Sequence, residues 1–248
     1  RDCNGMLFRD VKKGLEASGN MPTSDETPKV TIFTVVKNSE RTIERTILAV
    51  HSQTYPNIEY IVIDGLSSDG TCKIIKENLN CISYWNSQPD EGIADATNLA
   101  LSLATGKFVF WLCADDWIDP DFIAHGVSSL LKTQSSFIYG DIKAMQNNRE
   151  QKTIFGDKNY AANLHFRMTL TTPSIISETA LYQKFGLLDS QYLVANDYEL
   201  FLRLLKFGIL GTYCPGLVVY HSLGGVSTRY DFSCFREVRI VGIHYGSN

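Results

Sequence analysis

The strongest constraint on the fold is a series of short apolar runs that alternate with segments of helical periodicity. The first run, residues 30–36, reads VTIFTVV and is rich in β-branched side chains. Near-continuous runs of this kind are typical of strands that are covered on both faces. Further strands are expected at residues 58–63, 82–85 and 107–114. Because predicted helices separate these strands, the pattern indicates βαβ units, a mainly parallel Rossmann-like sheet and helices on both faces.

Over the whole chain, helices are expected after Ser39 and at residues 69–79, 92–105, 120–131, 178–185 and 196–207. After Ser135 the strands and helices no longer alternate regularly. Residues 137–145 and 152–155 flank Asn147-Asn148 and are expected to pair as an antiparallel hairpin. A last strand is expected at residues 212–220.

These elements predict one α/β domain over residues 29–228, with a first half at 29–134 and a smaller, partly antiparallel half at 135–228. An N-terminal extension or linker at residues 1–28 is expected to hold a short helix near 11–17. Residues 229–248 form a tail.

Composition excludes several classes of protein. The 248 residues carry 27 Asp and Glu against 23 Lys and Arg, and this mild acidity argues against a dedicated nucleic-acid binder. No apolar stretch has the length of a membrane span, and the N-terminus has no apolar region of the kind that signal peptides need. Six dispersed cysteines without a CxxC pair indicate neither a zinc knuckle nor a dense disulfide framework. We therefore expect a cytosolic globular protein with reduced thiols.

Carboxylates follow three of the four strands predicted in the first half. Asp64 ends the second strand, Asp90 follows the third, and Asp115-Asp116 follow the fourth. Ligands of open parallel sheets bind beyond the carboxyl ends of the strands. Each carboxylate is alternatively a helix cap or a polar loop residue, but two adjacent carboxylates after an apolar strand are costly unless they are neutralised. A divalent cation such as Mg²⁺ or Mn²⁺ would relieve that cost.

The usual phosphate-binding loops are absent from the sequence. There is no GxxxxGK[ST] segment, and no GxGxxG follows the first strand. A Walker-type phosphate cradle and a Rossmann dinucleotide site are therefore both disfavoured. A metal ion that bridges a diphosphate is the natural substitute, which suggests a nucleotide-activated donor.

Six segments in a fixed order resemble the inverting glycosyltransferases of family 2, which have the GT-A fold. The resemblance extends over about residues 29–227, nearly the whole globular part. The segments are residues 30–39, 64–71 (DGLSSDGT), 89–98 (PDEGIADATN), 104–106 (ATG), 115–120 (DDWIDP) and 196–203 (NDYELFLR). Each is weakly specific alone, but their common order and spacing make the similarity strong.

The resemblance implies roles for individual residues. It implies that Asp197 is the catalytic base and that Asp116, in a DXD-type element, is a metal ligand. Among the donor-binding residues, Asp64 would contact the nucleobase and Asp115 would lie nearer the ribose or the sugar. The other implied donor-binding residues are Thr34, Val36, Ser67, Asp90 and Asp95. The resemblance also implies Mn²⁺ or Mg²⁺ as cofactor and a nucleotide-sugar donor, by default a UDP-sugar.

Alternatives stay open for two of these carboxylates. Asp95 is interpreted equally well as an exposed helix residue. Asp197 is alternatively an N-terminal helix cap, unless Asn196 serves as the cap and leaves Asp197 to take the proton of an acceptor hydroxyl. The chain also departs from the common family pattern at several positions, which are Leu66, Ser68, Glu91, Ala94, Cys113 (often Asp) and Thr172 (often His).

His221 and the tail are lesser candidates. His221 follows the last predicted strand. One interpretation is that His221 and the glycine-containing loop at residues 224–227 approach the diphosphate. The favoured interpretation is that His221 is a half-buried structural residue. Residues 230–245 interleave aromatic residues with arginines and predict an amphipathic helix. Docking on its own domain is the default expectation, with a membrane surface or a partner as the alternatives.

Together these features predict a cytosolic, metal-dependent inverting glycosyltransferase. Its expected partners are a nucleotide-sugar donor and a carbohydrate or lipid-linked glycan acceptor, with peripheral association at the inner face of a membrane and no nucleic acid. Two alternatives remain. A nucleotidyltransferase acting on sugar phosphates shares the sheet and the carboxylates, but it usually has a basic, Gly-rich loop after the first strand. A non-catalytic nucleotide-sugar-binding module would not need both Asp116 and Asp197.

Overall fold

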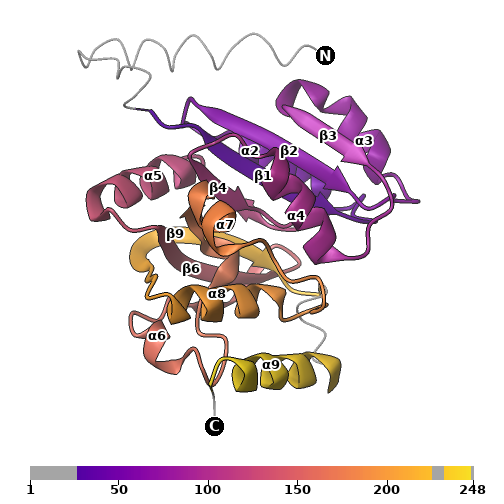
Figure 1. Cartoon of the computed structure of the whole chain (residues 1–248). Coiled ribbons are helices and arrows are strands. Elements are labelled where there is room, and N and C mark those ends of the chain that lie inside the picture. Colours follow the sequence, from indigo (N-terminus) through magenta and orange to yellow (C-terminus); the bar gives the residue numbers. More distant parts are fainter. Residues whose placement is uncertain (1–26, 225–231, 247–248) are drawn as a thin grey trace, which may run out of the picture.

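The computed structural model describes residues 27–224 and 232–246 (Figure 1). The helix expected near residues 11–17 and loop residues 225–227 lie outside the described residues. In chain order the strands are β1 Val30–Val36, β2 Ile58–Asp64, β3 Tyr84–Ser87, β4 Phe108–Trp111, β5 Trp117–Ile118, β6 Phe137–Gln146, β7 Arg149–Ile154, β8 Ile176–Glu178 and β9 Thr212–Ser222. The helices are α2 Ile43–His51, α3 Thr71–Glu77, α4 Ile93–Leu103, α5 Phe122–Thr133, α6 Tyr160–Asn163, α7 Thr179–Phe185, α8 Asn196–Lys206 and α9 Phe232–His244, with 3-10 turns η1 Leu79–Cys81 and η2 Thr172–Ser174.

The described strands form one sheet in the order β3-β2-β1-β4-β8-β6-β9-β5, and β7 pairs with β6. In the first half, β1 is parallel to β2 and β4, and β2 is parallel to β3. Val36 is the register partner of Asp64, so β1 and β2 end at the same level. This arrangement confirms the predicted parallel α/β architecture and places the strand-end carboxylates on one edge of the sheet.

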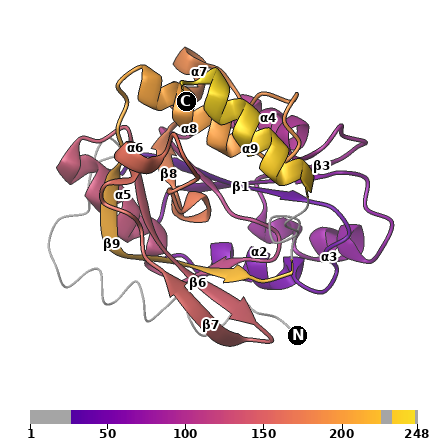
Figure 2. The ribbon, with the colours of Figure 1, turned by 90° about the horizontal axis from the view of Figure 1, so that it is seen from below.

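Helices cover both faces of the sheet because neighbouring residues of each strand point in opposite directions. Ile32 packs with buried residues of α2, α3 and α5, whereas Phe33 packs with buried residues of α4, α7 and α8. Figure 2 shows α4, α7, α8 and α9 on one side of the sheet and α2 and α3 on the other.

The second half contains the antiparallel part. Strand β8 is antiparallel to both β4 and β6, and therefore joins the two halves of the sheet. Asn147 and Asn148 have φ values of 51° and 59°, as the tight turn of a two-residue hairpin requires. The predicted β6–β7 hairpin is confirmed. Strand β9 is parallel to β6 and returns the chain toward the edge where the first-half strands end.

The structure differs from the sequence prediction around the fourth strand. The strand expected at residues 107–114 ends as β4 at Trp111. Its last ladder contact is the Leu112 N–H to the Phe33 carbonyl at 3.0 Å, after which the Asp116 N–H bonds to the Cys113 carbonyl at 3.1 Å and closes a turn. Strands β5 and β8 were not expected, because two or three residues are too short to show a period. No helix in the described part of the chain is long and apolar enough to cross a bilayer.

Candidate active site

Asp64 is the fully buried last residue of β2. Its carboxylate accepts hydrogen bonds from the Ser67 N–H (3.0 Å), the Ser67 hydroxyl (2.5 Å), the Ser87 hydroxyl (2.6 Å) and the Cys72 thiol (3.1 Å). Burial raises the pKa of Asp64, but these hydrogen bonds outweigh it and leave the pKa below its ordinary value. The group is therefore a fixed carboxylate at neutral pH.

Thr34 and Val36 lie near the end of β1, and both are buried on the face that α2 covers. The Thr34 hydroxyl donates to the Leu112 carbonyl at 2.8 Å and accepts from the Tyr60 hydroxyl at 3.0 Å. Both side chains are thus part of the packing around the ends of the strands. A direct contact of either residue with a donor stays a prediction.

The loop after β3 lies against the loop after β2. A Cβ atom on Gly65 would overlap the Asp90 carboxylate, so only glycine allows this approach. Asp90 accepts from the Gly92 N–H at 3.1 Å, and Asp95, which is exposed, accepts from the Glu91 N–H at 3.2 Å. These two hydrogen bonds hold the backbone directly before α4. Asp90 also lies beside the loop that begins at Asp64.

Asp116 contacts two consecutive residues of β9. Its carboxylate is fully buried, with Oδ2 2.9 Å from His221 Nδ1 and Oδ1 accepting from the Ser222 N–H at 2.9 Å. Burial lowers the pKa of His221, but its contact with Asp116 outweighs burial and leaves the pKa raised. His221 is half-buried, in agreement with the interpretation that the sequence favoured, and it contacts the predicted metal ligand Asp116.

Asp115 is half-buried beside this pair. Burial, followed by the negative charge of Asp116, raises the pKa of Asp115 to about 6. Within residues 27–224 and 232–246, no three His, Cys, Asp or Glu side chains are grouped as a metal site would require. The predicted metal ligand Asp116, with Asp115 next to it, therefore stays a prediction.

Arg45, on helix α2, contacts the residues that surround Asp116. Its guanidinium donates to the Asp115 carbonyl at 2.6 Å and to the Ser222 hydroxyl at 3.0 Å, and it lies 3.8 Å from the centre of the Trp117 ring. Trp117 stacks in turn on Tyr220 of β9, with ring centroids 5.3 Å apart. Arg45 was not expected at the site, because nothing in its local sequence indicates a contact with residues 70 and 177 positions away.

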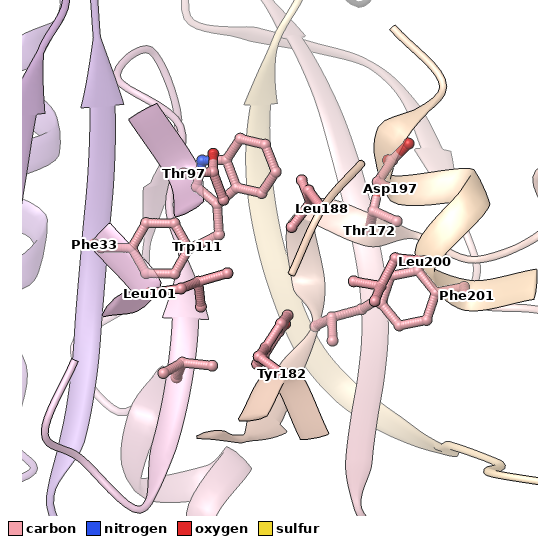
Figure 3. Close-up of a pocket in the computed structure, with 12 residues that line it drawn as sticks. Phe33, Thr97, Leu101, Trp111, Thr172, Tyr182, Leu188, Asp197, Leu200 and Phe201 are labelled. Carbon is pink, nitrogen blue, oxygen red and sulfur yellow. The ribbon is translucent and has the colours of Figure 1, made fainter. Parts of the chain in front are cut away.

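Asp197 lies in the first turn of α8 and is half-buried. Its carboxylate accepts from the Tyr198 N–H at 2.7 Å. Burial raises the pKa of Asp197, and a hydrogen bond with Thr172 partly opposes that effect. Asp197 and Thr172 line one side of a cavity whose other side includes Trp111 of β4 (Figure 3).

Cys113 connects the Asp116 region to Asp197. Burial raises the pKa of the Cys113 thiol well above its ordinary value, and the negative charges of Asp116, Asp115 and Asp197 raise it further. All three carboxylates therefore lie close enough to act on one side chain. The fold brings together residues that are about 80 positions apart in the sequence.

Helix α9 holds the segment that leads into Asp197. The Glu237 carboxylate accepts three backbone N–H groups, from Leu193 at 3.1 Å, Val194 at 2.8 Å and Ala195 at 3.0 Å. The sequence left open whether Asp197 or Asn196 caps this helix, and neither of them occupies the N-cap position. Ala195 occupies the N-cap position without a side-chain cap, and the Asn196 amide instead lies 3.5 Å from the Tyr192 carbonyl.

Comparison with known families identifies the chain. The sequence profile of the family described as "Glycosyl transferase family 2" matches residues 31–188, more than half of the chain. The chain belongs to glycosyltransferase family 2. It is thus a glycosyltransferase, and the resemblance seen in the sequence motifs is confirmed.

Two relatives are similar to this chain over most of its length. The chain is 30% identical over 180 residues to WfgD of Escherichia coli, a "UDP-Glc:alpha-D-GlcNAc-diphosphoundecaprenol beta-1,3-glucosyltransferase", and the match covers 71% of this chain and 70% of WfgD. It is 35% identical over 221 residues to the glycosyltransferase Rv1514c of Mycobacterium tuberculosis, covering 87% of this chain and 83% of the relative. Neither relative is a nucleotidyltransferase by name.

Solved structures confirm the GT-A fold of this glycosyltransferase. TarS 1-349 of S. aureus, in complex with UDP, has a TM-score of 0.69 at 18% identity, covering 88% of this chain and 65% of that one. The mannosyltransferase PcManGT of Pyrobaculum calidifontis, in complex with GDP-Man and Mn²⁺, has a TM-score of 0.61 at 19% identity, covering 94% and 67%. The chain spans only 39% of the longer TarS structure.

The contact between Glu237 and the segment at residues 193–195 generates a prediction. In Glu237→Gln an amide N–H₂ replaces one acceptor oxygen and opposes the backbone donors, at a cost of about 1–3 kcal/mol. We expect a lower unfolding midpoint and a lower rate of sugar transfer, with nucleotide affinity unchanged, because only the Asp197 side of the site loosens. Glu44→Gln, on the exposed surface of α2, is the matched control. Equal stability and rates for the two variants would contradict this role.

Proposed function

We propose that this chain transfers a sugar from a nucleoside diphosphate sugar, preferably a UDP-sugar, to an acceptor hydroxyl with inversion at the anomeric carbon. The observation that carries the proposal is that Asp197 lines one cavity with Trp111, the last residue of the strand that leads into Asp115 and Asp116. Inversion requires a carboxylate on the acceptor side and stabilisation of the leaving group on the other side. The two carboxylate centres meet both requirements.

The carboxylates of Asp115 and Asp116 fit a divalent cation, because Mn²⁺ and Mg²⁺ prefer oxygen ligands. We therefore assign Asp116, with Asp115 beside it, as the residues that would hold the ion. His221 positions the Asp116 carboxylate through their contact at 2.9 Å. When bound, the ion would stabilise the negative charge of the departing diphosphate.

Asp197 is the proposed general base. Its ionised carboxylate accepts the proton of the acceptor hydroxyl as the oxygen of that hydroxyl bonds to the anomeric carbon. The bond from that carbon to the nucleoside diphosphate breaks in the same displacement, so an α-linked donor yields a β-linkage. Packing on α9, through Glu237, holds the start of α8 and keeps this base in place.

The nucleoside is assigned to the strand ends of the first half. The fixed Asp64 carboxylate, the Ser67 loop and the adjacent Asp90 form its proposed surroundings, with Asp95 at the entry into α4. Relatives support a UDP-sugar, since WfgD is named for UDP-Glc and TarS has been solved with UDP. Thr34 and Val36 contribute by positioning these strand ends.

A lipid-linked glycan is the proposed acceptor. WfgD acts by name on a sugar linked through diphosphate to undecaprenol, which would place this chain at the inner face of a membrane. The outer surface of α9 suits that location, because Phe235 is 63% exposed, Ile243 is 59% exposed, and Arg236 and Arg239 are exposed beside them. Apolar and cationic side chains together favour an anionic lipid surface.

Thermal shift tests the proposed donor and metal. Measured against UDP, GDP, dTDP and their sugars, the melting temperature should rise most with the uridine compounds. The rise should require Mn²⁺, because the ion would neutralise the negative charge of the diphosphate beside Asp116. Asp116→Asn should lose the Mn²⁺-dependent part of the rise, while Asp121→Asn, at the N-terminus of α5, should keep it. The absence of a shift with every nucleotide would refute the donor site.

The pH dependence of transfer tests Asp197 as the base. Only the ionised carboxylate accepts a proton, so kcat/KM should fall as the pH decreases through the pKa of Asp197, which burial has raised. Thr172→Val removes a hydrogen bond that lowers this pKa and should therefore move the acid limb to higher pH. Thr133→Val, on the exposed end of α5, should leave the limb in place. An acid limb that does not move in Thr172→Val would count against the assignment.

A further inference from the structure

Helix α2 holds the backbone of the Asp115–Asp116 turn through two consecutive side chains. The Arg45 guanidinium donates to the Asp115 carbonyl at 2.6 Å, and the Thr46 hydroxyl donates to the Asp116 carbonyl at 2.8 Å. Thr46 is fully buried and Arg45 is half-buried. The backbone that carries both carboxylates is thereby tied to one helix.

Arg45 also joins this turn to two other elements. The Nη2 atom that bonds to Asp115 also donates to the Ser222 hydroxyl at the end of β9 at 3.0 Å, and Nη1 donates to the Asn148 side-chain oxygen at 3.1 Å. Ser222 itself donates from its hydroxyl to the Asp115 carbonyl at 2.5 Å and from its N–H to the Asp116 carboxylate at 2.9 Å. One guanidinium thus connects helix α2, the turn after β4, the end of β9 and the β6–β7 turn.

These contacts depend on the shape of the guanidinium. Its two terminal nitrogens reach acceptors on different elements, a geometry that the ammonium of a flexible lysine does not reproduce. Its charge has the opposite consequence for a bound cation, because like charges repel. The Nε–H of Arg45 is buried and has no partner among the described residues. The side chain is therefore held by its other contacts even though one of its donors is unsatisfied.

We propose that Arg45 is a positioning residue for the metal ion: its hydrogen bonds hold the Asp115–Asp116 turn in the geometry that binds the ion, against the repulsion of its own charge. Ligands that are held in place before an ion arrives bind it more tightly, because less ordering accompanies binding. The inference rests on the proposed function, since the ion is the one assigned there to Asp116 with Asp115 beside it.

Equilibrium dialysis of Mn²⁺ in the presence of UDP tests this inference without sugar transfer. Arg45→Lys keeps the charge and loses the paired contacts, whereas Arg45→Met loses both. Both variants should raise the Kd for Mn²⁺ by roughly tenfold, as the loss of groups that orient metal ligands usually does. Arg41→Lys and Arg41→Met, on the exposed surface before α2, are the matched controls and should leave the Kd unchanged. A lower Kd in Arg45→Met with an unchanged Kd in Arg45→Lys would assign only a charge effect and overturn the inference.

Ser222→Ala tests the same contacts with Arg45 in place. It removes one acceptor of the guanidinium and leaves the charge unchanged, and it should raise the Kd for Mn²⁺ in the same direction. This variant keeps the inference testable where the Arg45 variants do not fold. An unchanged Kd in Ser222→Ala and in Arg45→Lys would overturn the inference.

Steady-state transfer separates positioning from general packing. In Arg45→Lys the Mn²⁺ concentration for half of the maximal rate should rise by the same factor as the Kd, and saturating Mn²⁺ should restore kcat to the parent value. A lower kcat at saturating Mn²⁺ with an unchanged Kd would assign Arg45 to packing and overturn the inference. Absence of Mn²⁺ binding by the parent chain would instead refute the metal site of the proposed function, and this inference with it.

Discussion

The contact of Asp116 with His221 and Ser222 is the constraint on which the rest of the site depends. A fully buried carboxylate is costly unless it is paired, and here strand β9 supplies both partners from the far half of the chain. That pairing requires β9 to run parallel to β6 until it reaches the turn after β4. The turn after β4 in the first half is thereby fixed to β9 in the second half.

Asp197 is held in a different way. Its helix begins next to a segment whose three N–H groups bond to Glu237, and a second tether joins the Tyr245 hydroxyl to Glu199 at 2.5 Å. Glu199 also pairs with Arg203 at 2.8 Å. Helix α9 thus supports the start of α8. The membrane contact that we propose would use exposed residues of the same helix.

Much of the fold could be predicted from the sequence because its signals are local. The β-branched run of β1 and the Asn147-Asn148 turn both depend on neighbouring residues and were correct. Strands β5 and β8 were missed because their pairing depends on distant strands. In the site, the strand-end carboxylates followed from topology and motif order. Arg45, Glu237 and the pairing of His221 arise from contacts across many residues, and no local pattern indicates them.

The central claim is that Asp197 acts on the acceptor while a separate group of residues binds the donor. Asp197→Asn tests it most directly when nucleotide binding and sugar transfer are measured on the same preparation. The account predicts an unchanged Mn²⁺-dependent affinity for UDP and a transfer rate reduced by about 10² to 10⁴, the usual contribution of a general base. Transfer at the parent rate would contradict the account.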